Sequence, residues 1–156
     1  MIYLLYYRLI FQAKYISILT MINNKNLLVT GGTGTFGKAF IAHILKKYNP
    51  KKIIIFSRDE LKQYEISNSE TFKGIKNIRF FLGDVRDLER LKTAMSEVDI
   101  VVHAAALKQV PAAEYNPIEF IKTNIIGAQN IIEASIYNNV SRTYLKNIFN
   151  PTRAKS

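Results

Sequence analysis

The sequence contains no cysteine, and it has no apolar stretch long enough to cross a membrane. Without cysteine the chain can form neither a disulfide framework nor a thiolate zinc site, so a cytoplasmic setting is the simplest expectation. A membrane-spanning helix needs about 18 consecutive apolar residues, and every apolar run here is shorter. Histidine and acidic residues are not clustered at metal-ligand spacing, so we predict no metal site.

Acidic residues are missing from both ends of the chain. The formal net charge of +10 would by itself suggest a polyanionic partner such as nucleic acid. Residues 1–20 and 141–156, however, hold six of the 22 basic residues and none of the 12 acidic ones. Because the excess charge lies mostly at the ends, we predict no nucleic-acid partner and keep a basic nucleic-acid binder only as an alternative.

Residues 21–140 are expected to form one domain between a leader and a divergent basic tail, residues 141–156. With 156 residues and 48% hydrophobic content, the chain can bury one core of ordinary size. In residues 1–20, Arg8 interrupts the apolar segment and no small-residue cleavage site follows, unlike a secretory signal. A helix on a membrane surface is one alternative. We expect instead that the domain begins at Met21 and that the leader lies outside it.

Apolar runs of strand length alternate with helical patterns through residues 21–140. Strands are predicted at residues 26–30, 52–56, 77–84 and 98–106, and helices at 35–48, 57–69, 87–96 and 116–137. The expected apolar face of the first helix consists of Phe36, Ala39, Phe40, His43, Ile44 and Lys47. Ser57 and Glu60 have the spacing of a capping box for the second helix. The alternation predicts an α/β fold with a doubly wound parallel sheet of the Rossmann type.

The stretch LLVTGGTGTFGKAF, residues 27–40, places three glycines between a strand and a helix. Gly31 permits a tight turn, Gly34 lets the backbone approach a pyrophosphate, and Gly37 lets the helix lie close to the strand. The helix N-terminus offers N–H groups and partial positive charge to phosphates. A flexible turn is the alternative, but the strand–turn–helix context favours a dinucleotide cradle. The spacing of the glycines points to the short-chain dehydrogenase/reductase superfamily.

The residues after the second strand predict NADP rather than NAD. An NAD site usually places Asp or Glu there to accept the ribose 2′-hydroxyl. Here Ser57 and Arg58 come first, and a hydroxyl with a guanidinium suits a 2′-phosphate. Lys62, one helical turn beyond Arg58, can add charge on the same side. Asp59 and Glu60 argue against NADP, although a capping role would account for them.

The ends of the third and fourth strands carry further candidates. Asp84 closes the third strand, where its carboxylate can accept from an adenine amino group or can start a helix. Ala104, Ala105 and Ala106 end the fourth strand, where small side chains leave room for ribose and nicotinamide. We expect His103 to be a hydrogen-bonded core residue rather than a catalytic one.

Five strings carry a resemblance to one known family. They are SRDELKQ, GDVRD, HAAALKQVP, YNP and KTNIIGAQNIIEAS. Over residues 22–140 the chain closely resembles the inverting UDP-N-acetylglucosamine 4,6-dehydratases, extended short-chain dehydrogenases that begin bacterial routes to flagellin glycans, capsule or O-antigen. The resemblance implies a redox-neutral reaction: hydride passes from C4 to NADP, the C5 proton and the C6 hydroxyl leave as water, hydride returns to C6, and C5 is reprotonated from the opposite face.

Besides Gly31 and Gly37 of the glycine loop, the resemblance implies further cofactor-binding residues. Thr33, Gly34, Thr35 and Phe36 would wrap the pyrophosphate; Ser57, Arg58, Asp59, Glu60, Leu61 and Lys62 would surround the 2′-phosphate; Asp84 and Val85 would flank adenine; Ala104, Lys108 and Thr123 would approach the nicotinamide half. Lys108 would also reach the UDP-sugar substrate, unless it is a solvated loop lysine. Relatives assemble as homo-oligomers, and we expect the same here.

The family's proton-transfer residues are not expected in this chain. The family continues, after its fifth strand, into a Ser/Thr-Asp-Lys segment and a Tyr-x-x-x-Lys pair, whose lysine lowers the tyrosine pKa. Here the only such spacing is Tyr48 to Lys52, across a helix end and a strand start, and Tyr144 is followed four positions on by Ile148. We therefore predict no catalytic residue and a truncated or frameshifted product, cut after the fourth or fifth strand.

Such a product would expose a hydrophobic strand edge and an uncovered face of the sheet, so we predict that it expresses poorly or self-associates. Two other functions stay open beside a dehydratase without its catalytic half. One is a non-catalytic NADP(H)-binding sensor module, which needs no tyrosine. The other is a nucleotide-sugar epimerase of the same superfamily.

Overall fold

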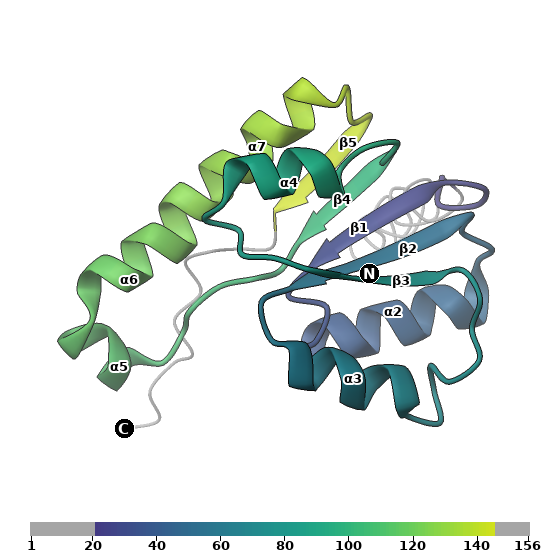
Figure 1. Ribbon diagram of the computed structural model, residues 1–156, viewed down its shortest axis with the longest axis horizontal. Helices are drawn as coiled ribbons and strands as arrows, with labels where there is room; N and C mark the ends of the chain where they lie inside the picture. Colours follow the sequence, from purple (N-terminus) through teal and green to yellow (C-terminus); the bar gives the residue numbers. More distant parts are fainter. Residues whose placement is uncertain (1–20, 146–156) are drawn as a thin grey trace, which may run out of the picture.

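The computed structural model describes residues 21–145, and in this range five parallel strands form one sheet (Figure 1). The predictions for residues 1–20 and 146–156 concern residues outside this range. The strands are β1 (Asn26–Thr30), β2 (Lys52–Ser57), β3 (Ile78–Leu82), β4 (Ile100–His103) and β5 (Arg142–Leu145). Their order in the sheet is β3-β2-β1-β4-β5, with every neighbouring pair parallel. This arrangement confirms the predicted doubly wound fold.

Helices cover both faces of the sheet (Figure 1). One face carries α2 (Thr35–Lys47) and α3 (Glu60–Asn68), and the other carries α4 (Leu88–Ala94) and α7 (Gly127–Tyr137). Between β4 and α7 lie α5 (Val110–Tyr115), α6 (Pro117–Ile121) and a π-helical segment, η1 (Lys122–Ile126). In Figure 1, α6 continues into α7 as one long rod, and this rod projects beyond the sheet.

The central strands β1 and β4 are buried along their whole length because helices cover them on both sides. Successive side chains of a strand point to opposite faces, so Leu28 and Val29 of β1 enter different cores. Val29 packs in the layer that contains Ile41 and Ile44 of α2. Leu28 packs in the opposite layer, with Leu91 of α4 and Ile131 of α7.

The face that α2 presents to the sheet agrees only in part with the predicted one, because Ile44 is buried and Phe40 packs against the core but the rest of the predicted stripe does not. Its buried residues are Gly37, Ile41 and Ile44, whereas Phe36 is 41% exposed and Ala39 is exposed. The reason is local packing at Gly37: a Cβ atom there would collide with the carbonyl oxygen of Gly31 and the backbone of Gly32. This close approach fixes the rotation of α2, so the buried stripe runs from Gly37 rather than from Phe36.

The predicted capping box at Ser57 is wrong. Asp59 is the N-cap of α3, and its Oδ1 accepts a hydrogen bond of 2.9 Å from the backbone N of Lys62. Ser57 cannot cap the helix because it is still the last residue of β2, paired in register with Leu82 of β3. The helix therefore begins at Glu60, three residues after the predicted start at residue 57.

Two features near the C-terminal end of the described residues differ from the expected pattern. The predicted long helix over residues 116–137 is present, but its middle turn is the π-helical η1. The sheet also continues beyond Val140, because Arg142 to Leu145 pair in parallel register with Ile100 to His103. The first residues of the basic tail therefore form β5, and the described sheet has five strands.

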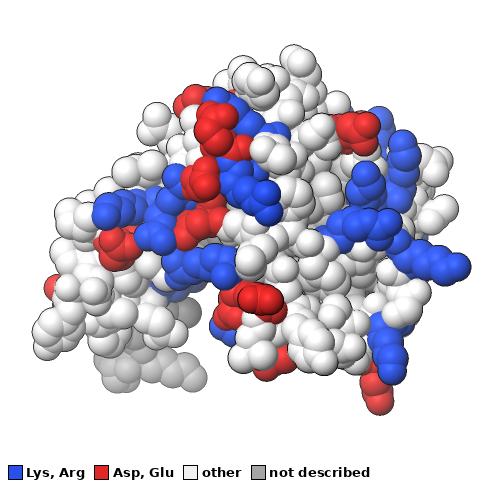
Figure 2. All heavy atoms as spheres, in the orientation of Figure 1, with Lys and Arg blue, Asp and Glu red and all other residues white. Residues whose placement is uncertain are grey.

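The surface of the described residues is mixed in charge. On the face shown in Figure 2, acidic and basic side chains lie interspersed, and several touch one another. Within residues 21–145, no helix has the length and apolar character needed to cross a bilayer.

Candidate functional site

A cavity of about 350 Å³ opens at the carboxyl ends of the strands. Four consecutive loops build its walls, each following one of the strands β1 to β4. Its lining residues are Gly31, Thr33, Gly34, Phe56, Ser57, Arg58, Asp59, Lys62, Gly83, Asp84, Val85, Ala104, Ala105, Ala106, Leu107 and Thr123. The strand order reverses between β1 and β4, and open α/β sheets bind ligands at such a switch point.

Gly31 makes the tight turn that starts the glycine loop. Its φ is 67°, a left-handed conformation that favours glycine. A Cβ atom at Gly31 would also lie 2.7 Å from the backbone N of Ala105, which follows β4. The loops after β1 and β4 therefore touch backbone to backbone, and only glycine fits between them.

Gly34 is less crowded by neighbouring atoms than Gly31. Its φ of −80° suits any residue, and a Cβ atom there would meet only one protein atom within 4 Å, the Gly31 carbonyl oxygen at 3.3 Å. Gly34 is the N-cap of α2, yet its cap makes no side-chain hydrogen bond and the first turn has no acidic residue. Helix α2 thus points a positively polarised N-terminus, without a protein anion, towards the cavity.

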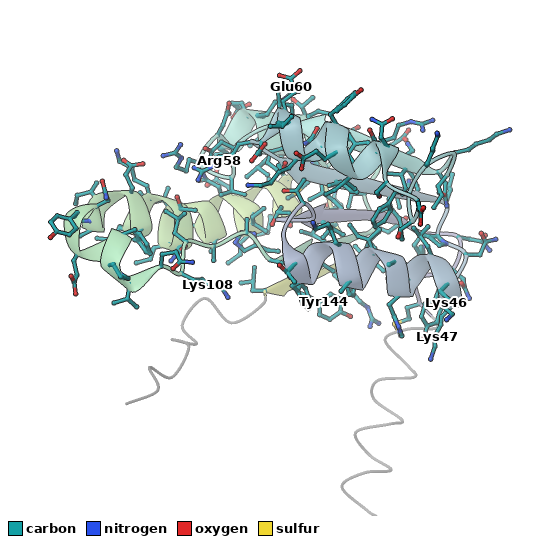
Figure 3. All side chains as sticks on the ribbon, turned by 90° about the horizontal axis from the view of Figure 1, so that it is seen from below. Lys46, Lys47, Arg58, Glu60, Lys108 and Tyr144 are labelled. Atoms are coloured by element: carbon teal, nitrogen blue, oxygen red, sulfur yellow. The ribbon has the colours of Figure 1, made fainter. Side chains whose placement is uncertain are left out.

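The C-terminal end of α2 carries two lysines that stabilise the helix dipole. Lys46 and Lys47 lie in the last turn, where cations interact favourably with the helix C-terminus (Figure 3). These lysines stand at the opposite end of the helix from Gly34. They therefore lie away from the cavity, and they stabilise the helix rather than contribute to the site.

Arg58 is the cation that the end of β2 presents to the cavity. Its side chain is 54% exposed, and its Nη1 lies 3.7 Å from Asp84 Oδ2. Lys62 also lines the cavity, but its Nζ is 2.9 Å from Asp59 Oδ2. The hydrogen bond with Asp59 raises the pKa of Lys62, and the Lys62 backbone N–H followed by its ammonium lowers the pKa of Asp59. The two charges balance, so Arg58 is the cation at the end of β2 that Asp59 does not neutralise.

Gln63 positions the loop that bears Arg58. It is 7% exposed, and its Nε2 donates to the carbonyl oxygens of Ser57 at 3.1 Å and Phe81 at 3.2 Å. These bonds tie α3 to the ends of β2 and β3. Nothing in the sequence pattern distinguishes this glutamine from a surface residue, because its partners become neighbours only in the folded sheet.

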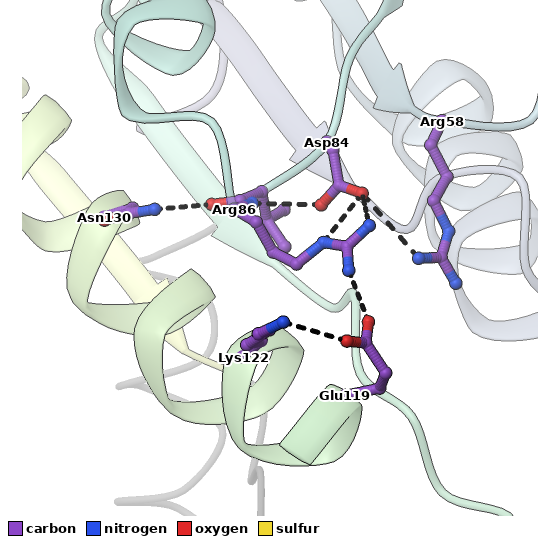
Figure 4. A network of polar contacts seen from close by, with 7 residues as sticks. Arg58, Asp84, Arg86, Glu119, Lys122 and Asn130 are labelled. Carbon is purple, nitrogen blue, oxygen red and sulfur yellow. Dashed lines mark hydrogen bonds and ion pairs between the residues drawn. The ribbon is translucent and has the colours of Figure 1, made fainter. Parts of the chain in front are cut away.

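Asp84 forms the centre of a polar network after β3 (Figure 4). Its Oδ1 accepts from the backbone N of Arg86 at 3.0 Å, and its Oδ2 accepts from the Arg86 guanidinium at 2.7 Å and 3.0 Å. Partial burial raises the pKa of Asp84, but the Arg86 hydrogen bonds and the Arg86 and Arg58 charges outweigh burial and hold this pKa below its ordinary value. Asp84 does not start α4, because Asp87 is its N-cap.

Thr30 and His103 fix the start of the loop after β4. Thr30 Oγ1 lies 2.6 Å from His103 Nδ1 and accepts from the backbone N of Ala104 at 3.2 Å and of Ala105 at 3.3 Å. Thr30 therefore donates its own proton to Nδ1. His103 is a core residue as predicted. Only one of its two ring nitrogens is hydrogen-bonded, because Nε2 has no partner among the described residues.

The opposite wall of the cavity comes from η1. Thr123 is 6% exposed and lines the cavity, and its Oγ1 has no hydrogen-bond partner within residues 21–145. The next residue, Asn124, donates to the carbonyl oxygen of Leu107 at 2.9 Å and accepts from its backbone N at 2.8 Å. This amide pair locks the loop after β4 onto η1.

Most of the sequence-predicted site residues meet at this cavity. Those that line it are Gly31, Thr33, Gly34, Ser57, Arg58, Asp59, Lys62, Asp84, Val85, Ala104 and Thr123. Those that do not line it are Thr35, Phe36, Gly37, Glu60, Leu61 and Lys108. Thr35 instead lines an adjoining hollow of about 370 Å³ between α2 and α3. Glu60 and Lys108 are exposed, on α3 and on the loop before α5 (Figure 3).

Three lining residues were not predicted. Phe56 and Gly83 belong to the ends of β2 and β3, and Leu107 follows the three alanines. Gly83 is required by packing, because a Cβ atom there would press on the Phe56 ring and on Arg90 Cγ. That contact depends on the β2–β3 pairing and on α4, which no local pattern encodes.

The tyrosines of the described residues lie apart from this cavity's lining. Tyr48 is the C-cap of α2 and Lys52 starts β2, so this Tyr-x-x-x-Lys spacing lies at the amino edge of the sheet. Tyr144 lies on β5, opposite Val102, and packs against the core on the α2 face (Figure 3). Its position is structural.

A family described as polysaccharide biosynthesis protein matches residues 27–145. The inverting UDP-N-acetylglucosamine 4,6-dehydratase of Campylobacter jejuni (serotype O:23/36) is 57% identical over 122 residues. That alignment covers 78% of this chain and 36% of the dehydratase. The UDP-glucose 4-epimerase of Rickettsia bellii is 46% identical over 125 residues, with 78% and 36% covered.

Solved structures show the same partial likeness. The Pen protein of Bacillus thuringiensis superposes with a TM-score of 0.75 at 41% identity, covering 80% of this chain and 38% of Pen. The dTDP-glucose 4,6-dehydratase DesIV of Streptomyces venezuelae, solved with NAD and TYD bound, gives 0.65 at 25% identity, covering 76% and 38%. The chain thus spans about a third of the length of the curated relatives it matches.

Proposed function

The chain belongs to the polysaccharide biosynthesis protein family, and on that premise we propose that it binds NADP in the cavity at the β1–β4 switch point. We further propose that this nucleotide-binding unit serves the 4,6-dehydration of UDP-N-acetylglucosamine with inversion at C5, for bacterial surface polysaccharide or flagellin glycan. The dehydratase of C. jejuni, 57% identical over the shared region, supports this substrate. A cytoplasmic setting and assembly into homo-oligomers are part of the proposal.

The observation that carries the proposal is the open N-terminus of α2. A Cβ atom at Gly34 would meet one backbone atom, the Gly31 carbonyl oxygen at 3.3 Å, and α2 begins there without a side-chain cap or first-turn acid. Backbone N–H groups at such a terminus bind a pyrophosphate. Thr33 at the same turn would contact the pyrophosphate, and Thr123 on the opposite wall would contact the nicotinamide half of the dinucleotide. Bound NADP would accept and return hydride, and the chain would bind and orient it.

The preference for NADP over NAD rests on charge at the end of β2. Asp59, the first carboxylate after this strand, is engaged with the N-terminus of α3 and with Lys62. The Asp59 carboxylate is therefore not available to accept a hydrogen bond from a ribose hydroxyl. Arg58 is half-exposed at the cavity and suits a 2′-phosphate.

A second candidate is a nucleotide-sugar 4-epimerase. The observation that favours it is the 46% identity to the R. bellii epimerase over a similar stretch. Both reactions would use the same cofactor half. A non-catalytic NADP(H) sensor is the remaining alternative, and it would need only the cavity.

The cofactor assignment is tested by titrating the chain with NADP and NAD and by comparing two glycine variants. We expect tighter binding of NADP than of NAD. Gly34→Ala should weaken nucleotide binding strongly, because the new methyl group enters the phosphate space, and should lower the melting temperature much less than Gly37→Ala, because its contact with the Gly31 carbonyl oxygen is longer. Gly37→Ala should instead destabilise the fold by about 1–3 kcal/mol through overpacking. Unchanged nucleotide affinity in the folded Gly34→Ala protein would refute the cradle.

The reaction is tested by a chimera. Residues 21–145 would replace the matching region of the C. jejuni dehydratase, and the purified chimera would be given UDP-N-acetylglucosamine. Formation of the 4-keto-6-deoxy product inverted at C5 supports residues 21–145 as the cofactor half of a dehydratase. The same replacement in the R. bellii epimerase tests the epimerase alternative, which is favoured if only that second chimera is active. Two chimeras that bind NADP and convert no sugar, beside active parent enzymes, support the sensor.

A further inference from the structure

Two arginines contact the Asp84 carboxylate, Arg86 by hydrogen bonds and Arg58 at a longer distance. Arg86 makes three bonds to the carboxylate, at 2.7 Å and 3.0 Å from its guanidinium and 3.0 Å from its backbone N. Arg58 approaches the same Oδ2 only to 3.7 Å and keeps 54% of its side chain exposed (Figure 4). Arg58 is therefore the loosely held partner, and it is the one at the cavity.

Arg86 itself stands outside the lining of the cavity. Its Nη1 contacts Glu119 Oε2 at 2.6 Å, and Glu119 also pairs with Lys122 at 3.1 Å. The network thus joins three cations to two carboxylates and is positive by one charge. Without Arg86 the remaining charges would balance, and Asp84 would have Arg58 as its nearest cation.

We propose that Arg86 is a specificity-determining positioning residue: by occupying Asp84, it leaves Arg58 available for the 2′-phosphate of the nucleotide. The inference rests on the proposed function, because it presupposes that Arg58 recognises this phosphate. Loss of Arg86 lets Arg58 close onto Asp84 and leaves a less compensated carboxylate near the phosphate. Both changes disfavour a nucleotide with a 2′-phosphate and affect a nucleotide without one much less.

The experiment measures the ratio of two dissociation constants, for 5′-ADP and for 2′,5′-ADP, by calorimetry on the full chain at low ionic strength, where exposed charges are least screened. The ratio cancels effects on the shared adenosine. Arg86→Gln should reduce the preference for 2′,5′-ADP about fivefold, the upper range for an exposed ion pair. Arg86→Lys should recover part of the preference.

Two controls separate this role from general effects. Arg79→Gln removes an equal charge near the start of β3, where Arg79 bonds the carbonyl oxygens of Lys76 and Ile78, and should leave the ratio unchanged. In an Asp84→Asn background, Arg86→Gln should have no further effect, because the carboxylate through which Arg86 acts is gone. Melting temperatures identify any variant that fails to fold, and Arg86→Met, which also removes the charge, then carries the comparison.

The outcomes are distinct for the inference and for the proposed function. If wild type prefers 2′,5′-ADP, Arg58→Gln loses the preference and folded Arg86→Gln or Arg86→Met keeps it in full, the inference is wrong and NADP recognition stands. An equal effect of Arg86→Gln with and without Asp84 also overturns the inference. If wild type shows no preference, or Arg58→Gln retains it, NADP recognition by Arg58 fails and takes the inference with it.

Discussion

His103 shows at the residue scale how a buried polar group makes stability depend on pH. The ring is 1% exposed, and burial lowers its pKa from 6.5 to about 4. In the unfolded chain the imidazole takes up a proton near pH 6.5, so between pH 6.5 and 4 the unfolded state binds more protons than the folded state. We expect the free energy of unfolding to fall by about 3 kcal/mol between pH 7 and pH 4 from this residue alone.

Urea denaturation at several pH values measures this effect. The control is His103→Asn, whose carbonyl oxygen can still accept from Thr30 but cannot titrate. Carboxylates with lowered pKa, such as Asp84 and Asp99, lose stabilisation mainly near and below pH 4, below most of the window assigned to His103. Parallel pH profiles for wild type and His103→Asn would contradict the assignment.

Individual site residues differ in how far the sequence could predict them. Gly31, Gly34 and Arg58 directly follow strands, so their place at the carboxyl edge followed from the alternation of strands and helices. The network of Asp84, Arg86 and Arg58 did not, since Arg58 reaches Asp84 only through the pairing of β2 with β3. Lys108 was placed at the cavity by resemblance alone, and in the structure it is exposed outside the lining.

At the scale of elements, the strands were the most predictable part, because an apolar run of four to six residues between two helical patterns is too short for a core helix and fits a buried strand. The rotation of α2 was not predictable from apolar periodicity, because a glycine contact rather than a large side chain sets it. The π-helical η1 was also hidden, since its sequence, KTNII, continues an ordinary helical pattern. π-Helical turns occur often at functional sites, and this one places Thr123 and Asn124 beside the cavity.

The Asn124 lock yields a prediction about this element. Asn124→Ala removes both hydrogen bonds to Leu107, and each buried group left without a partner costs about 1–3 kcal/mol. We expect the loop after β4 to loosen, with faster amide hydrogen exchange at Leu107 and weaker nucleotide binding. Asn116→Ala, which removes only the 3.1 Å bond to the Ala112 carbonyl, is the matched control. Unaltered exchange at Leu107 would show that the lock does not hold the loop.

At the scale of the whole molecule, the two edges of the sheet are unequal. Within residues 21–145, β3 and β5 are the two edge strands, and β5 adjoins an apolar hollow of about 530 Å³. Ile125, Ile132, Ile136 and Leu145 line this hollow, and each is 41–72% exposed. An apolar face beside an open strand edge favours association between molecules.

We therefore expect the chain to associate reversibly in solution, with a sedimentation coefficient that rises with concentration. Replacing Ile132 and Ile136 by lysine should shift the population towards monomer without lowering the melting temperature, because both side chains are at least 45% exposed and contribute little to the core. Tyr64→Lys, at a residue on α3 that is 68% exposed, is the control and should leave association unchanged. A wild-type chain that stays monomeric at high micromolar concentration would show that the α7–β5 face is not adhesive. Equal dissociation by Tyr64→Lys would instead assign the effect to added charge rather than to this face.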